Sequence, residues 1–309
     1  MLRAWGARWL GAFEGTDRLS NGLLAADDQR IERSSENAMS TDVDDANRQF
    51  WNELCGTQLA RSLGIRDAGP ESLRRFDDWY LDYYPYLDDE IPFTTLAGRR
   101  VLEVGVGYGT VSGRLMEHGA ELTVLDIASA PVAMVKHRAR QLGVECRTVE
   151  GSILEAPFDD GEFDAVVAIG CYHHTGDVQR ALDETHRVLT PRGRAYVMVY
   201  NAYSYRRWVF ETRATLGLWL AEWRSVPGAP GGAEPERRRY DVDSAGAAAP
   251  HTDFSSVRAF RRMTRRWTKL EYRRRNAGAE GPLRRLERRT AIGLLGPLLG
   301  LDLYFRLTR

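Results

Sequence analysis

The stretch that most constrains the fold is residues 101–110, with the sequence VLEVGVGYGT. A short apolar strand leads into a turn with three glycines, and residues 113–118 have the composition of a helix. Glycine takes positive φ angles and lets a ligand approach the backbone, and the helix N-terminus beyond the turn offers unpaired N–H groups. The sequence therefore predicts an α/β fold with a ligand-binding corner here. For the triplet alone, a plain tight turn is the alternative interpretation.

The glycine spacing is Gly105-x-Gly107-x-Gly109, with Tyr108 inside the turn, and it differs from the G-x-G-x-x-G of dinucleotide-binding folds. An acid, Glu103, lies two residues before the first glycine. This pattern resembles motif I of the class I S-adenosylmethionine (SAM) dependent methyltransferases. SAM carries a cationic sulfonium and amino group and no phosphate, so a carboxylate near the turn favours it. The resemblance implies that these five residues bind the cofactor.

A second strand, residues 122–126, ends in Asp126 about twenty residues after the first glycine. An acid at this place accepts hydrogen bonds from ribose hydroxyls. The segment with Asp126 and Ile127 resembles the ribose-binding motif of the same family. Asp126 also precedes a helical stretch at residues 131–142, so helix capping is the alternative role, and both roles can coexist.

Residues 149–164 resemble the third loop of the family and its PFDDGxFD lead-in to the fourth strand. Relatives commonly have an acid that bonds the adenine amino group where this chain has Ser152, so the resemblance implies a weaker bond or one made by backbone. Ile153 is expected to pack on the adenine face. The fourth strand, residues 165–170, is a continuous apolar run that ends at Gly170, as in a parallel strand buried on both faces. Gly170 is a further expected cofactor contact.

A helix at residues 178–189 with an RVLxPxG tail and a fifth strand at 194–200 complete the resemblance, which covers residues 99–200. It implies a Rossmann-like class I methyltransferase fold, with a seven-stranded, mostly parallel sheet and helices on both faces. The last two strands, expected near 270–272 and 301–307, form an antiparallel edge in this family. The predicted parts are a weakly ordered extension (1–44), a helical cap (45–98), the SAM-binding core (99–200), a lid insertion (201–252) and a C-terminal part that completes the fold (253–309).

The extension shows no sustained apolar period, and Met39 precedes the first patterned helix as a possible later start. A partner-binding arm carrying Trp5 and Trp9 is the alternative. The cap is rich in aromatic residues, and Tyr80, Tyr83 and Tyr84 lie near one helical face. Tyrosine combines apolar area with a polar tip, so this group is predicted to orient a substrate. Packing of the aromatic rings against the sheet is the competing interpretation.

Residues 203–223 predict an amphipathic helix, and the following proline- and glycine-rich run predicts a loop. Ser255 is the predicted cap of a helix over 256–267. Residues 201–309 carry 22 Lys and Arg against 11 Asp and Glu, although the whole chain holds 43 of each kind. The C-terminal part is therefore either an anion-facing surface or a solvated helix face that the acidic half neutralises.

No apolar run reaches the length of a membrane span, and no clear signal peptide opens the chain. The three cysteines have no C-x-x-C spacing, which argues against a disulfide framework or a cysteine metal site. We therefore expect no metal and a location in the reducing cytoplasm.

A methyl group on a sulfonium is already activated, so alignment of the acceptor can supply most of the catalysis. An alcohol or phenol acceptor also benefits from a base, and histidine is the usual choice. His173 and His174 follow the fourth strand at the carboxyl edge, where ligands bind in open α/β sheets. His173 is the preferred base, and His174 and His251 are the other candidates. Tyr172, in the same turn, is a predicted substrate contact.

These features predict an enzyme that transfers a methyl group from SAM to a small-molecule acceptor, with O-methylation favoured and S-adenosylhomocysteine as the product. Natural-product or specialised metabolism is the expected context. A peptide acceptor, including a carboxylate, stays open. RNA is disfavoured because no RNA-binding module and no Asn-Pro-Pro-Tyr type motif is present. A non-catalytic SAM-binding protein is the alternative from another class, and Glu103, the glycines and Asp126 argue against it.

Overall fold

The computed structural model describes residues 42–53, 58–65, 67–224, 231–278 and 285–309. The chain from Val43 to Arg309 forms one unit, and residues 1–42 form another. The predicted extension therefore lies almost wholly outside the described residues, as do Cys55 and the Pro227–Gly228 turn.

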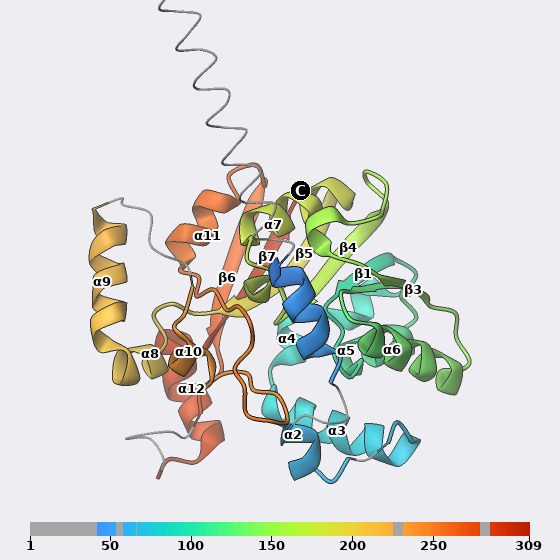
Figure 1. The fold of residues 1–309 in the computed structure, drawn as a ribbon. Helices are drawn as coiled ribbons and strands as arrows, with labels where there is room; N and C mark the ends of the chain where they lie inside the picture. The colour runs from blue at the N-terminus through green and yellow to red at the C-terminus, as the bar shows by residue number, and fades with distance from the viewer. Residues whose placement is uncertain (1–41, 54–57, 66, 225–230, 279–284) are drawn as a thin grey trace, which may run out of the picture. The chain divides into compact units, whose positions relative to one another are not determined.

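A seven-stranded sheet with the order β3-β2-β1-β4-β5-β7-β6 forms the centre of the second unit (Figure 1). The first five strands in that order pair in parallel, and β7 runs antiparallel between β5 and β6. This is the predicted class I architecture with its antiparallel edge. The strands are β1 (Arg100–Val104), β2 (Glu121–Asp126), β3 (Arg147–Glu150), β4 (Phe163–Ile169), β5 (Leu189–Tyr200), β6 (Lys269–Arg275) and β7 (Asp302–Thr308).

Helices cover both faces of the sheet because alternate residues of a strand point to opposite faces. In β4, Val166 packs into one core together with α7 and α11, whereas Val167 packs into a second core with α5 and α6. These helices are α5 (Thr110–Glu117), α6 (Ser129–Leu142), α7 (Val178–Val188) and α11 (Val257–Met263), with short 3-10 turns η2 (Ile153–Glu155) and η3 (Tyr172–His174) before α7.

The segment before β1 is helical, as predicted. A helix over residues 43–51, drawn in blue in Figure 1, precedes α2 (Gln58–Ser62), α3 (Pro70–Tyr83), α4 (Leu87–Glu90) and the 3-10 turn η1 (Phe93–Leu96). Asp44 lies inside the first of these helices, so the expected boundary at residue 44 falls within an element. Buried Glu90 of α4 ties this segment to the sheet edge, because it accepts a hydrogen bond from Arg275 Nε of β6 at 2.6 Å.

The insertion after β5 contains α8 (Tyr205–Phe210), α9 (Thr212–Trp223) and α10 (Glu234–Arg237), and α12 (Arg288–Leu299) precedes β7. The single helix predicted over 203–223 is wrong. The backbone breaks at Glu211, whose φ of −126° and ψ of 38° end α8. The cap predicted at Ser255 is also wrong by one residue: Ser256 is the N-cap of α11, and its Oγ accepts from Ala259 N. In the part of the chain that the structure describes, no helix is both long and apolar enough to cross a bilayer.

Candidate active site

The glycine turn joins β1 to α5, and the structural reason for having a glycine differs at each of its three glycine positions. All three have positive φ angles. A Cβ on Gly105 would overlap the side chain of Cys171, and one on Gly109 would meet Arg138 and Val135 of α6 at about 3.0 Å. A Cβ on Gly107 would meet nothing within 4 Å. Gly107 therefore leaves open space where a ligand can approach the backbone.

Glu103 lies at the inner side of this turn. Its carboxylate accepts a hydrogen bond from Ser112 Oγ of α5 at 2.5 Å, and the residue is 3% exposed. Burial raises the pKa of Glu103 to about 8. Glu103 lines a cavity of about 580 Å³ together with Tyr108, Gly107 and other residues of the turn. The predicted acid is therefore at the cofactor corner, behind the glycines.

Asp126 ends β2 beside the turn. Its Oδ2 accepts from Val106 N at 2.8 Å and its Oδ1 from Ala128 N at 2.9 Å. Burial raises the pKa of this carboxyl to about 6, and the backbone N–H donors oppose that rise. Asp126 does not cap α6, whose N-cap is Ala128. Asp126 and Ile127 both line a second cavity of about 620 Å³, here called the main cavity. There a carboxylate oxygen can accept from further donors.

A partly buried ion pair fastens the helical cap to the glycine turn. Arg138 of α6 donates from both terminal nitrogens to Asp77 of α3 at 2.8 Å, and its Nε donates to the Tyr108 carbonyl at 2.6 Å. Thr110, the first residue of α5, donates to the same Asp77 at 2.6 Å. Phe76 stacks on the Tyr108 ring with centroids 4.0 Å apart. These contacts hold α3 against the turn.

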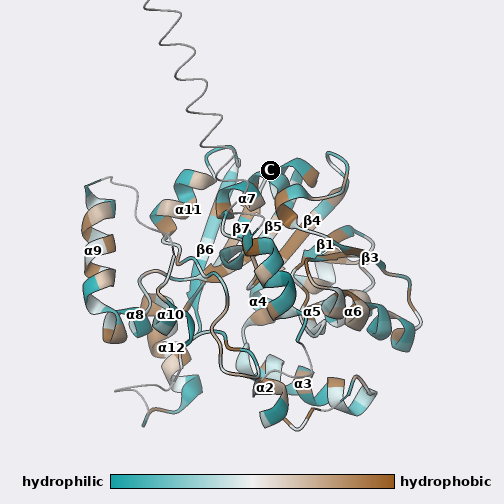
Figure 2. Cartoon of the chain, in the orientation of Figure 1, coloured by the Kyte–Doolittle hydropathy of each residue, from teal (hydrophilic) through white to brown (hydrophobic). Residues whose placement is uncertain are grey.

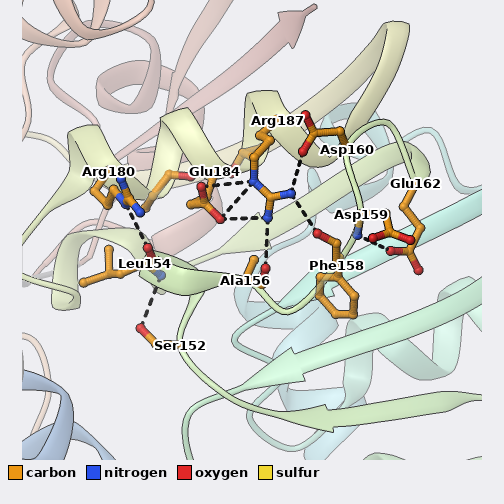
Figure 3. Close-up of polar contacts among 12 residues, drawn as sticks. Ser152, Leu154, Ala156, Phe158, Asp159, Asp160, Glu162, Arg180, Glu184 and Arg187 are labelled. Atoms are coloured by element: carbon orange, nitrogen blue, oxygen red, sulfur yellow. Dashed lines mark hydrogen bonds and ion pairs between the residues drawn. The ribbon is translucent and has the colours of Figure 1, made fainter.

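Hydrogen bonds from α7 hold the loop after β3 in place (Figure 3). Ser152 Oγ accepts from Leu154 N and starts η2. Arg187 donates to the carbonyls of Ala156 and Phe158 at 2.9 and 2.7 Å, and its Nη2 pairs with Glu184 at 2.9 Å. The loop is therefore fixed with Ser152 and Ile153 lining the main cavity.

The helix over residues 43–51 covers this loop. Asn47 donates to the His174 carbonyl at 2.7 Å, and Asn52, just after the helix, accepts from Ala130 N at 2.8 Å. Asp44 hydrogen-bonds Ser152, and burial raises the pKa of this carboxyl. An acid therefore lies beside Ser152, and this acid comes from a different segment of the chain.

The main cavity has a volume of about 620 Å³. Its wall runs from the glycine turn past the carboxyl ends of β2, β4 and β5 to the start of β7. Of the predicted residues, it includes Tyr80, Tyr83, Tyr84, Gly105, Gly107, Asp126, Ile127, Ser152, Ile153, Gly170 and His174. The cavity therefore gathers seven of the ten expected cofactor contacts and the three cap tyrosines into one space, whereas Glu103 and Tyr108 line the cavity of about 580 Å³ and Gly109 lines neither.

His174 is the histidine that lines this cavity. Its Nδ1 lies 2.7 Å from the carbonyl oxygen of His251, and because a carbonyl only accepts, Nδ1 carries the proton. In the neutral ring Nε2 is then a free base. Nε2 lies 3.5 Å from Asp241 Oδ2, and Tyr200 donates to that same oxygen at 2.9 Å. Burial lowers the pKa of His174, and the Asp241 carboxylate opposes this effect.

His173, the preferred base, lies elsewhere. Its ring is fully buried against Tyr200, lines neither cavity, and has no hydrogen-bond partner on either nitrogen among the described residues. Burial lowers its pKa well below the ordinary value. His251 also lies off both cavity walls, and its Nε2 contacts Asp253 at 2.9 Å. Tyr172 is in the core, where its hydroxyl contacts Thr185 at 2.5 Å. Of the histidines in the prediction, the structure thus brings His174 to the cavity.

The sequence interpretation missed several residues on the cavity wall. Asp241 comes from the insertion, which buried Arg207 of α8 and Glu236 of α10 hold in place through a 2.7 Å ion pair. Asp302 starts β7 and accepts from Asn276 at 2.9 Å, and burial raises its pKa to about 7. Asp302 pairs in register with Tyr200, so the antiparallel strand begins at the edge where β5 ends. The signal in the sequence that could have identified such residues was the presence of polar residues at the ends of these strands.

Residues 102–197 match a family model described as a methyltransferase domain. The chain is 36% identical over 106 residues to a demethylmenaquinone methyltransferase of Thermus thermophilus, a match that covers 34% of this chain and 48% of that protein. It is 32% identical over 110 residues to a ubiquinone biosynthesis O-methyltransferase of Azotobacter vinelandii, with 34% and 46% covered. The matched part thus spans about half the length of these curated relatives.

Among solved structures, an S-adenosylmethionine-dependent methyltransferase from Mesorhizobium loti is 18% identical with a TM-score of 0.47, and the match covers 73% of this chain and 97% of that one. The matched family model and the strand order together agree with the motifs at the glycine turn. Residues 102–197 are therefore similar to a methyltransferase domain, and the sheet around them has the strand arrangement predicted for the class I methyltransferase fold.

Proposed function

We propose that this protein transfers the methyl group of SAM to a hydroxyl oxygen of a small-molecule acceptor, with His174 as the general base. The observation that carries the proposal is the pairing of His174 Nε2 with Asp241 at 3.5 Å on the wall of the cavity that also contains Gly107 and Asp126. The cavity volume of about 620 Å³ falls in the range of small-molecule sites.

The residues at the turn fit the cofactor. Gly107 offers open backbone, Asp126 presents a carboxylate for ribose hydroxyls, and Ile153 offers an apolar surface for adenine. Asp44 supplies an acceptor beside Ser152, where relatives commonly have an acid. When bound, SAM supplies a methyl group already activated by the sulfonium.

The acceptor hydroxyl would lie between the cofactor and His174. His174 Nε2 would take the proton of that hydroxyl, and SAM would supply the methyl group to its oxygen. The products are the methylated acceptor, S-adenosylhomocysteine and a protonated His174 that returns its proton to solvent. Asp241 stabilises the imidazolium, and the His251 carbonyl fixes the tautomer.

Tyr80 and Tyr83 of α3, together with Tyr84 at its C-cap, line the same cavity as Tyr200 and would surround an aromatic or otherwise flat acceptor. One relative is named a ubiquinone biosynthesis O-methyltransferase, which favours an oxygen acceptor. We place the reaction in the cytoplasm, as the cysteine pattern suggests, and specialised metabolism stays the predicted context. Methylation of a peptide or of RNA is the alternative, and non-catalytic binding of SAM is the third possibility.

Calorimetric titration with SAM separates a binder from a non-binder, with Gly107→Val as the control that obstructs the backbone approach. Mass spectrometry of a cell extract incubated with SAM and protein should then show a small molecule heavier by one CH₂ unit. Asp126→Ala should lower the amount of that product when SAM is limiting. SAM binding without any such product from small molecules, peptides or RNA would favour the non-catalytic alternative.

A further inference from the structure

Helix α9 buries polar side chains and exposes large apolar ones. Thr215 is fully buried, and its hydroxyl donates to the Arg207 carbonyl of α8 at 3.2 Å. Glu222, one heptad later, is also buried and accepts from Tyr203 at 2.8 Å. The side of α9 that packs on the protein is therefore held by hydrogen bonds.

The exposed side of α9 is an apolar stripe. Leu216, Trp219 and Trp223 follow each other at helical spacings of three and four residues, with exposed fractions of 45%, 48% and 69%. Brown turns of α9 stand at the margin of the view in Figure 2. Val209 and Phe210, at the end of α8, are exposed next to the start of α9. A contiguous exposed apolar surface of this kind marks an interaction site.

The charges around this stripe have one sign. Arg213 and Arg224 are exposed near the two ends of α9. Glu222 is the one acid in the sequence of α9, and it is buried. Glu211, at the preceding break, pairs with Arg239. The exposed face thus combines tryptophan, leucine and arginine, and it lies in the part of the chain where basic residues outnumber acidic ones by 22 to 11.

This composition selects the partner. Exposed aromatic and aliphatic side chains insert among lipid headgroups, and the two flanking arginines are attracted to anionic lipids. A second copy of the same face would bring like charges together at both ends of the stripe. We propose that the corner of α8 and α9, with Val209, Phe210, Leu216, Trp219 and Trp223, docks this protein on an anionic membrane surface.

The docking surface is joined to the cavity through α8. Arg206, on the same short helix as Val209 and Phe210, lines the main cavity. Docking therefore places one wall of the cavity near the lipid headgroups. This inference goes beyond the proposed methyl transfer, and it holds or fails independently of the acceptor.

Co-sedimentation of the full chain with vesicles of phosphatidylcholine, with and without phosphatidylglycerol, tests the inference. We expect binding to the vesicles that contain phosphatidylglycerol, weakened by salt. The double variant Trp219→Ser/Trp223→Ser should lower that binding roughly tenfold or more, and Arg213→Gln/Arg224→Gln should lower it and flatten its salt dependence. The matched control is Leu142→Ser/Val144→Ser, which removes exposed apolar side chains elsewhere and should bind as the wild type does.

Three results would overturn the inference: no binding to the anionic vesicles, an equal loss in the control, or a self-associated wild type that the tryptophan variant turns into a monomer by sedimentation. Because SAM titration of the same variants reports on the cofactor site, loss of the fold is distinguished from loss of docking.

Discussion

The side chain of Cys171 occupies the position that a Cβ on Gly105 would take. Cys171 Sγ donates to the Val104 carbonyl at 3.1 Å, so the turn after β4 packs directly on the end of β1. This contact brings the two strand ends together at the cofactor corner.

Replacement of Gly105 should therefore cost stability more than replacement of Gly107. Both residues have positive φ angles, which cost an alanine roughly 1–2 kcal/mol. Gly105→Ala also creates the overlap with Cys171, whereas Gly107→Ala points into open space. Chemical denaturation should show the larger loss for Gly105→Ala. Equal losses would mean that the packing against Cys171 relaxes without cost.

Asp126→Ala should weaken SAM binding by roughly 1.5–3 kcal/mol, because it removes a charged acceptor for the ribose hydroxyls. Calorimetry measures the effect. Asp164→Ala is the control, since this acid pairs with Arg100 at 3.1 Å at the other end of the sheet. Wild-type affinity in Asp126→Ala would place the ribose elsewhere.

His174→Gln should lower turnover by about 10²–10⁴ and leave SAM affinity intact. His173→Gln should act on stability instead, because its ring is buried against Tyr200. Steady-state rates and melting curves of both variants separate the two roles. If His173→Gln alone lost turnover at an unchanged melting temperature, His173 would be the base.

The pH profile of turnover gives a second test of the base. Burial lowers the pKa of His174, so the wild-type rate should rise through a pH below about 6.5 and then stay level. Asp241→Asn removes the carboxylate that opposes this lowering, so the acid limb should move to lower pH and the plateau should fall. An acid limb that does not move would show that Asp241 does not act on His174.

Glu103 should make the protein less stable as the pH rises. Its pKa is about 8 in the folded protein against an ordinary value of 4.5, so the folded state holds the proton more tightly than the unfolded chain. The resulting stability is fully present below about pH 4.5 and is lost as the pH rises through 8. The stability of Glu103→Gln relative to wild type should therefore increase between about pH 5 and 8.

A chain that begins at Met39 should melt within a few degrees of the full chain and bind SAM equally well. A chain that begins at Asn52 lacks Asp44 and Asn47, which contact Ser152 and the His174 carbonyl, and should bind SAM more weakly. Calorimetry of the pair tests the role of the helix over residues 43–51. Weak binding by the Met39 chain would place an essential contact before that residue.

Much of the core could be predicted from local patterns. Apolar runs around 101–104, 122–126 and 165–169 became the parallel strands, because a strand buried on both faces needs a continuous apolar sequence. The glycines and Asp126 stand at the predicted corner, because a strand, a tight turn and a helix fix their relative positions within about twenty residues.

Contacts between segments that are far apart in the sequence could not be predicted from these local patterns. Neighbouring His173 and His174 differ in sequence position by one residue, yet the 3-10 turn η3 sends one ring into the core and the other to the cavity. Asp44 beside Ser152 and Asp241 beside His174 join parts of the chain that no local period relates. The break at Glu211 likewise followed from the packing of α9, whose buried side is polar.

Local patterns along the chain are enough to predict the core strands and helices, the glycine turn and the acid that ends β2, because short-range sterics and hydrophobic periodicity act between neighbouring residues. Which histidine faces the cavity, which acid stands beside it and what covers Ser152 depend on the folded arrangement of distant segments. Those choices depend on the burial of charge and on hydrogen bonds between segments that meet only after folding.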